Sequence, residues 1–210
     1  MSTELSTLLE PFITGLSAAQ YDQIARHLEL LLLWNQRINL SGIRNREEII
    51  TRHFGESLFA ARELFPPESE LKVMDIGSGA GFPGIAFKIY APRTNLIMVE
   101  SQNKKATFLR EAIRQLGVQQ ASVFDDRAEK IAETADLVTM RAVEKFSNIL
   151  PVAGGLVRPG GRIGLMIGEA QIPAVNRLLP DFQWKPPVAL PQSSGRILFI
   201  GSNPSHGQEK

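Results

Sequence analysis

Apolar residues recur at helical spacing in the first third of the chain. One such pattern follows Ser17 and continues through Leu32, and Gln20, three residues after Ser17, completes the signature of a capping box. A second pattern begins at Asn45, a residue type that commonly caps helices, and stops at Pro66-Pro67. The chain up to these prolines is therefore expected to be helical.

After the prolines, short apolar runs alternate with stretches that can form helices. The five runs span residues 71–77, 94–101, 121–126, 135–142 and 161–168. Strands alternating with helices predict a parallel sheet. The clearest helix of this part begins at Asn103, expected as its cap, and ends at Gly117. Two further strands, within 183–191 and 195–201, are expected to close the sheet in antiparallel fashion.

The pattern predicts an α/β fold with a mostly parallel sheet and a helical N-terminal extension. The expected parts are an extension over 1–66, the α/β domain over 67–201 and a disordered polar tail over 202–210. A chain of 210 residues is suited to one main domain with an appendage.

Composition narrows the function classes only slightly. The chain has 23 basic and 22 acidic residues, so a site for a polyanion has to be a local patch. The lack of cysteine excludes disulfides, zinc-thiolate sites and cysteine nucleophiles, and no metal is expected. The longest apolar run, 28–34, is too short to span a membrane, and the start lacks the basic region of a signal peptide. We expect a cytoplasmic protein without membrane contact.

The stretch MDIGSGAGFPG, residues 74–84, fits two binding motifs. Read as G-x-G-x-x-G it is a dinucleotide fingerprint, and read as D-x-G-x-G-x-G it is typical of S-adenosylmethionine sites. Glu100 ends the second strand and suits the ribose hydroxyls in either case. Asp75 would repel a pyrophosphate, and Pro83 withholds an amide that a pyrophosphate would use. Hydride transfer also usually needs a separate substrate domain. The residues favour S-adenosylmethionine, with an NAD(P)-binding oxidoreductase or a turn without ligand as alternatives.

Six ordered blocks resemble one family. They read WNQRINLSGI, RHFGESL, DIGSGAGFPG, VESQNKKATFLREAIRQL, RAEKI and TMRAV, and they are similar to the bacterial 16S rRNA guanine-N7 methyltransferases, RsmG or glucose-inhibited division protein B. The resemblance implies a seven-stranded, Rossmann-like methyltransferase fold, a cytoplasmic location and methylation of one guanine in 16S rRNA, free or in a small-subunit ribonucleoprotein. Glu56 stands where the family usually has aspartate, and Ile167 where it tends to have lysine.

This reaction needs no catalytic base. Guanine N7 has an in-plane lone pair and no proton, so we expect alignment of the reactants to be the main contribution of the protein. The chain also lacks the cysteine used for carbon-5 methylation and the [N/D]-P-P-[Y/F] segment used for exocyclic amino groups. A methyltransferase acting on a small molecule, or a protein that only senses the cofactor, remains an alternative.

The expected cofactor residues surround the strand ends. The residues of the glycine-rich turn and of the second strand are assigned from the motif itself. Arg141 is assigned because it follows the fourth strand, at the edge of the sheet where ligands bind. Ala128 and Glu129 are assigned from the resemblance. The expected set is Gly77, Gly79, Phe82, Glu100, Ala128, Glu129 and Arg141. Arg141 suits a cofactor carboxylate or an RNA phosphate. Arg127 is expected on the same rim, with a possible positioning role.

Two basic clusters are candidates for RNA contact, although solvated charged faces look the same. The first comprises Lys104 and Lys105 on one predicted helix. The second comprises Arg44, just before another predicted helix, and Arg46 and Arg52 on that helix. His53 is interpreted either as a packed structural residue or as a contact to RNA or cofactor. The segment NLSGI, residues 39–43, is a candidate loop over the pocket. We expect a monomer.

Overall fold

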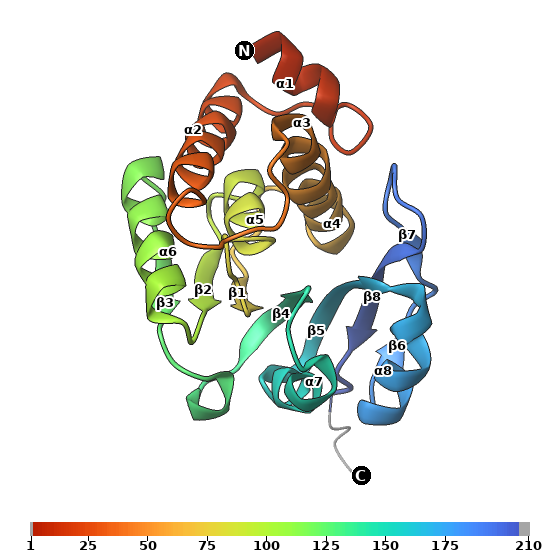
Figure 1. Ribbon diagram of the computed structural model, residues 1–210. Helices are drawn as coiled ribbons and strands as arrows, with labels where there is room; N and C mark the ends of the chain where they lie inside the picture. Colours follow the sequence, from red (N-terminus) through yellow and green to blue (C-terminus); the bar gives the residue numbers. More distant parts are fainter. Residues whose placement is uncertain (1, 206–210) are drawn as a thin grey trace.

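The computed structural model describes residues 2–205 of the chain, and its centre is a twisted sheet (Figure 1). The strands are β1 (Lys72–Ile76), β2 (Asn95–Val99), β3 (Ala121–Phe124), β4 (Ala135–Arg141), β5 (Val157–Gly168), β6 (Gln183–Trp184), β7 (Val188–Ala189) and β8 (Arg196–Ser202). Their order is β3-β2-β1-β4-β5-β8-β6, and β7 also pairs with β8. Strands β1 to β5 pair in parallel, and β8 runs antiparallel to β5.

The expected mostly parallel sheet with an antiparallel closure is confirmed. The described residues form eight strands where seven were expected, because the segment 183–191 is divided into β6 and β7. Pro186 and Pro187 lie between the two strands, and proline has no backbone N–H to donate to a neighbouring strand.

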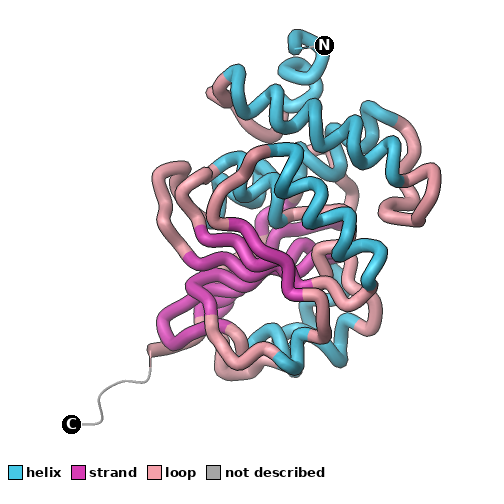
Figure 2. Tube along the Cα trace, turned by 90° about the vertical axis from the view of Figure 1, so that its left-hand side faces the viewer, coloured by secondary structure: helices cyan, strands magenta, loops and turns pink. Residues whose placement is uncertain are grey.

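Helices cover both faces of the sheet (Figures 1 and 2). They are α1 (Ser2–Leu9), α2 (Ala18–Trp34), α3 (Arg46–Glu48), the π-helix η1 (Ile49–Gly55), α4 (Glu56–Leu64), α5 (Gly84–Tyr90), α6 (Asn103–Leu116), α7 (Phe146–Gly155) and α8 (Ile172–Leu178), with short 3-10 turns at Ala128–Lys130 and Glu169–Gln171. Contacts join α4 to α5 and α2 to α6 on one face, and α7 to α8 on the other.

The helix boundaries follow the predicted capping signals closely. Ser17 and Gln20 form the expected capping box, and Gly117 ends α6 with φ of 62°. The cap of α6 is Gln102, so the expected cap Asn103 is instead the first residue of the helix. Asn45 caps the second helix as predicted, but this helix contains the π-helical turn η1, which the sequence pattern did not indicate.

The N-terminal helices share one hydrophobic core with the sheet. Phe12, Phe54 and Leu58 from the helical region belong to the same buried cluster as Val73 and Phe87. The extension is therefore packed into the α/β part along one face.

The polar tail begins later than expected. Ser202 belongs to β8, and Asn203 donates a side-chain hydrogen bond to the carbonyl oxygen of Val157 at 2.8 Å. Residues 206–210 of the expected disordered tail lie outside the described residues.

Candidate functional site

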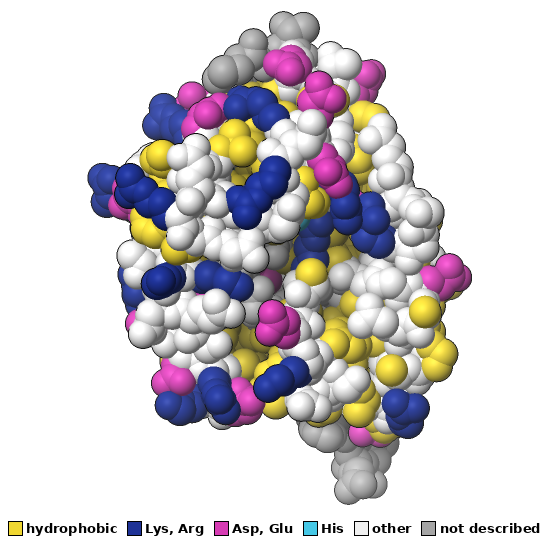
Figure 3. Space-filling view, viewed as in Figure 1, with side chains coloured by type: hydrophobic (Ala, Val, Ile, Leu, Met, Phe, Trp, Pro, Cys, Tyr) yellow, Lys and Arg dark blue, Asp and Glu magenta, His cyan; other side chains and the backbone are white. Residues whose placement is uncertain are grey.

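A cavity of about 660 Å³ opens where β1 to β4 end and the N-terminal extension meets the sheet. Figure 3 shows a hollow near the centre of this face, with Lys and Arg side chains on both sides of it. Every residue of the expected cofactor set lines the cavity, and so do Arg127, Lys105 and His53. The sheet edge predicted from the strand pattern thus coincides with an open site.

The glycine-rich turn gives the cavity a wall of bare backbone. Gly77 and Gly79 have φ of 72° and 53°, a region that L-residues with side chains rarely adopt. A Cβ on Gly79 would meet only the Gly77 oxygen, at 3.8 Å, whereas a Cβ on Gly77 would lie 2.9 Å from Val143. A ligand can therefore approach the Gly79 backbone closely.

Glu100 organises this turn from the neighbouring strand end. Its side chain is buried and accepts hydrogen bonds from the backbone N–H of Gly79 at 3.0 Å and of Gln102 at 2.8 Å. A carboxylate has about four acceptor positions, so each oxygen retains capacity for a hydroxyl donor in the cavity.

Asp75 decides between the two readings of the glycine motif. Its Oδ2 accepts from the Gly84 N–H at 3.1 Å, at the first turn of α5, and Pro83 next to it has no N–H. The amide at this helix start is thus occupied by a carboxylate and is not free for a pyrophosphate. The geometry disfavours the dinucleotide reading, as the expected effects of Asp75 and Pro83 on a pyrophosphate indicated.

Burial raises the pKa of Asp75 from 3.8 to about 7, and its Oδ1 has no hydrogen-bond partner among the described residues. Between these pH values the unfolded chain binds fewer protons at this group than the folded chain. Through Asp75 alone, the free energy of unfolding should then fall by up to about 1.4 kcal/mol per pH unit as the pH rises from 4 to 7.

Asp75→Asn should remove this contribution, because an amide oxygen still accepts from Gly84 but does not titrate. Urea unfolding of both proteins at several pH values across this window measures the difference. We expect the variant to gain stability relative to the wild type as the pH rises. A difference that is constant with pH would contradict the assignment.

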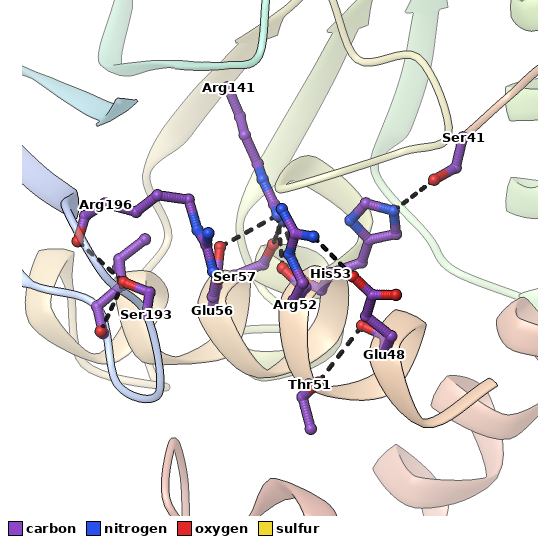
Figure 4. Close-up of polar contacts among 11 residues, drawn as sticks. Ser41, Glu48, Thr51, Arg52, His53, Glu56, Ser57, Arg141, Ser193 and Arg196 are labelled. Carbon is purple, nitrogen blue, oxygen red and sulfur yellow. Dashed lines mark hydrogen bonds and ion pairs between the residues drawn. The ribbon is translucent and has the colours of Figure 1, made fainter. Parts of the chain in front are cut away.

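Arg141 lies at the expected strand end, but most of its donors are occupied (Figure 4). Nη1 donates to the carbonyl oxygen of His53 and to Ser57 Oγ, and Nη2 donates to the carbonyl oxygen of Arg52 and to Glu56 Oε2. Burial lowers the pKa of Arg141 to about 10. The guanidinium fork that we expected to face a ligand is instead bound to η1 and to the start of α4, and Nε has no hydrogen-bond partner among the described residues.

Glu56 joins two arginines from distant parts of the chain. It is 1% exposed, and it pairs with Arg141 at 3.2 Å and with Arg196 at 2.7 Å (Figure 4). This position was noted in the sequence only as a departure from the usual aspartate. The longer glutamate places one oxygen on each arginine and so connects α4, β4 and β8.

His53 is a packed residue that also lines the cavity. Its ring stacks on Phe82 with centroids 4.9 Å apart, and Phe82 stacks in turn on His27 at 5.0 Å. Its Nε2 lies 2.7 Å from Ser41 Oγ. Burial, and to a smaller extent the Arg141 charge, lowers the pKa of His53 to about 3, so the ring is neutral at neutral pH.

The structure separates the candidate RNA contacts. Lys105 lines the cavity and Lys104 is exposed, with no ion pair at either among the described residues. Arg44 is exposed and donates to the Asn35 carbonyl oxygen at 2.6 Å. Arg46 and Arg52 form ion pairs instead: Arg46 with Glu29 at 2.6 Å, and Arg52 with Glu48 at 2.7 Å.

Several functional contacts were missed in the sequence. Buried His27 fixes the glycine-rich turn through Ala80, whose carbonyl oxygen lies 3.0 Å from Nε2. Val143, Asn148 and Ile149 line the cavity after β4. The segment Leu40–Ile43 also lines it, as the interpretation of NLSGI as a pocket loop predicted. Of these residues, only the NLSGI segment could be recognised from the sequence, because it lies between two predicted helices.

None of the helices in residues 2–205 is long and apolar enough to cross a membrane. Within the same residues, no three His, Asp or Glu side chains are grouped so that they could hold a metal ion.

Known proteins match most of the chain. The family described as rRNA small subunit methyltransferase G, GidB, matches residues 20–182. The protein named ribosomal RNA small subunit methyltransferase G from Stenotrophomonas maltophilia strain K279a is 42% identical over 156 residues, which cover 73% of this chain and 72% of that protein. The one from Xanthomonas axonopodis pv. citri is 40% identical over 172 residues, 80% and 79% of the two chains.

A solved structure shows the same fold. Magnesium protoporphyrin IX methyltransferase from Synechocystis PCC 6803, with S-adenosylmethionine bound, superposes with a TM-score of 0.65 at 11% identity and covers 84% of this chain and 97% of that one. The sheet and its flanking helices thus form the Rossmann-like fold of the S-adenosylmethionine-dependent methyltransferases.

Proposed function

The chain belongs to the rRNA small subunit methyltransferase G family, and from that membership we propose that it methylates N7 of a specific guanine in 16S rRNA with S-adenosylmethionine as methyl donor. The match over residues 20–182 carries the proposal, because it includes the glycine-rich turn, Glu100 and the strand end at Arg141. The function expected from the six sequence blocks agrees with the description of the matched family.

The cavity fits the cofactor on its own geometry. Gly77 and Gly79 form a cradle that side chains would fill, and the buried Glu100 carboxylate has acceptor capacity left for ribose hydroxyls. Ala128 and Glu129 line the part of the cavity after β3, where we assign the adenine. Phe82 lines the wall next to the turn and suits the methionine part.

When bound, S-adenosylmethionine supplies a methyl group on a positively charged sulfur. The residues of this chain align the two reactants and exclude water, and we assign no general base because guanine N7 has no proton to lose. His53 is neutral, and four of the five N–H donors of Arg141 are engaged, so both act as positioning residues in this proposal.

The RNA surface is proposed to include the cations around the cavity that have no carboxylate partner within residues 2–205. Lys105, Arg127 and Lys145 line the cavity. Lys104 and Arg44 are exposed, and each is adjacent in sequence to a residue that lines the cavity. Arg46 and Arg52 are weaker candidates because each is paired with a glutamate. Such a local patch is consistent with a net charge of only +1. We further propose a monomer that acts in the cytoplasm on rRNA or on a small-subunit particle.

The test follows the methyl group. The purified protein is incubated with labelled S-adenosylmethionine and either 16S rRNA or small subunits from cells that lack the gene, and the digested nucleosides are identified by mass spectrometry. We expect one 7-methylguanosine per RNA, and none after saturation with S-adenosylhomocysteine. Label on another atom, or no label in either RNA substrate, would overturn the proposal.

A further inference from the structure

The cavity has a wall that the assigned cofactor residues do not use. Those residues come mainly from the ends of β1, β2 and β3, and in the sheet β4 lies on the opposite side of β1 from β2 and β3. The wall consists of Leu40–Ile43 from the extension, His53 from η1 and Arg141–Lys145 after β4. The three segments are connected, because Ser41 contacts His53 and the His53 carbonyl oxygen accepts from Arg141.

The segment Leu40–Ile43 is held in one shape by its neighbours. Asn35, 5% exposed, accepts from the N–H of Leu40 at 2.9 Å and of Ser41 at 3.1 Å, and its Nδ2 donates to the Ser41 carbonyl oxygen at 3.0 Å. Ser41 Oγ accepts from the Ile43 N–H at 3.1 Å, in addition to its contact with His53. In Figure 1 this connection runs from the end of α2 across the molecule to α3.

Gly42 lies in the middle of this rigid segment and makes no such bond. Its N–H and carbonyl group have no hydrogen-bond partner among the described residues. A Cβ on Gly42 would have no heavy atom within 4 Å, and its φ is outside the left-handed region. Gly42 thus presents an unpaired donor and acceptor beside open space in the cavity wall, which is the chemistry that reads the edge of a nucleobase.

We propose that the wall formed by Leu40–Ile43, His53 and Arg141–Lys145 is the subsite for the methyl-accepting purine, and that the base lies against the backbone of Gly42. This inference rests on the proposed function and names the place of its second reactant. Reading an unpaired, extruded base in such a pocket is how enzymes reach a ring atom that a stacked helix hides. The stacking of His53 on Phe82, with ring centroids 4.9 Å apart, then joins this base wall to the cofactor wall.

Gly42→Ala tests the proposal, because the added methyl group meets no heavy atom of the protein within 4 Å and would stand on the backbone against which the base is placed. Gly155→Ala is the matched control: its Cβ position also has no atom within 4 Å, and Gly155 does not line the cavity. We expect both variants to keep the wild-type melting temperature within about 2 °C and the same affinity for S-adenosylhomocysteine. Gly42→Ala alone should lower kcat/KM for the RNA at least about tenfold.

Two results would overturn the subsite. Wild-type kcat/KM for the RNA in Gly42→Ala would show that no base lies there, and weaker cofactor binding in that variant would assign the segment to the cofactor. If the wild type methylates no rRNA, the proposed function fails, and the subsite is then judged by NMR alone. In cofactor-saturated wild-type protein, guanosine monophosphate should shift the Gly42 amide signal and cytidine monophosphate should not. The lack of a guanosine-specific shift would also refute it.

Discussion

Glu56→Ala should destabilise the protein by about 3 kcal/mol. Removal of one partner from a buried ion pair typically costs about 3–5 kcal/mol, since the remaining charge stays buried without compensation. The lower end applies here because Arg196 is 34% exposed and can be solvated, whereas Arg141 is only 12% exposed. Urea unfolding followed by circular dichroism measures the free energy of unfolding.

Glu63→Ala on the same helix is the control. Glu63 pairs with its neighbour Arg62 at 3.2 Å, but the two side chains are 34% and 44% exposed. An exposed ion pair contributes about 0–1 kcal/mol, so this variant should unfold nearly as the wild type does. Equal effects of Glu56→Ala and Glu63→Ala would show that the buried cluster does not stabilise the junction of α4, β4 and β8.

Glu100→Gln should weaken the binding of S-adenosylhomocysteine about 10- to 100-fold. Hydrogen bonds to a charged group contribute about 1.5–3 kcal/mol each, and glutamine replaces one accepting oxygen with a donor. Glu100 accepts from two backbone N–H groups, so the variant also turns a donor toward a donor at the glycine-rich turn. Isothermal titration calorimetry measures the affinity, and the melting temperature without ligand measures the stability of the turn.

Glu111→Gln serves as control for this variant. Glu111 lies on α6 outside the cavity and pairs with Arg114 at 2.6 Å. The control should bind the ligand with wild-type affinity. Wild-type affinity in Glu100→Gln as well would mean that the ribose lies elsewhere in the cavity.

Local patterns predicted the elements and the edge of the sheet that holds the site. The capping box at Ser17, the strand runs and the glycine-rich turn depend on residues close in sequence, and a strand end fixes where Arg141 emerges. The partners of Arg141 could not be predicted in this way. One of these partners, Glu56, also contacts Arg196, which is 140 positions away in the sequence. This contact depends on how the extension packs against the last strand.

The π-helical turn escaped prediction for a different reason. Its residues fit an α-helical apolar pattern, and the contacts that distinguish it come from a distant side chain: the Arg141 guanidinium donates to the carbonyl oxygens of Arg52 and His53 within the turn. That side chain reaches the turn only in the folded protein. Propensity over a short window contains no information about it.

The turn η1 also sets the rotational phase of the helix from Arg46 to Leu64. A π-helical turn accommodates one residue more than an α-helical turn, and each residue of an α-helix rotates the chain by about 100°. Everything after Gly55 is therefore turned by roughly that angle from where an uninterrupted α-helix would place it. Without the additional residue, Glu56 would point along a different side of the helix, away from both arginines. A one-residue insertion in a helix is thus sufficient to bring the ion-pair side and the cavity side of this segment into register with the sheet.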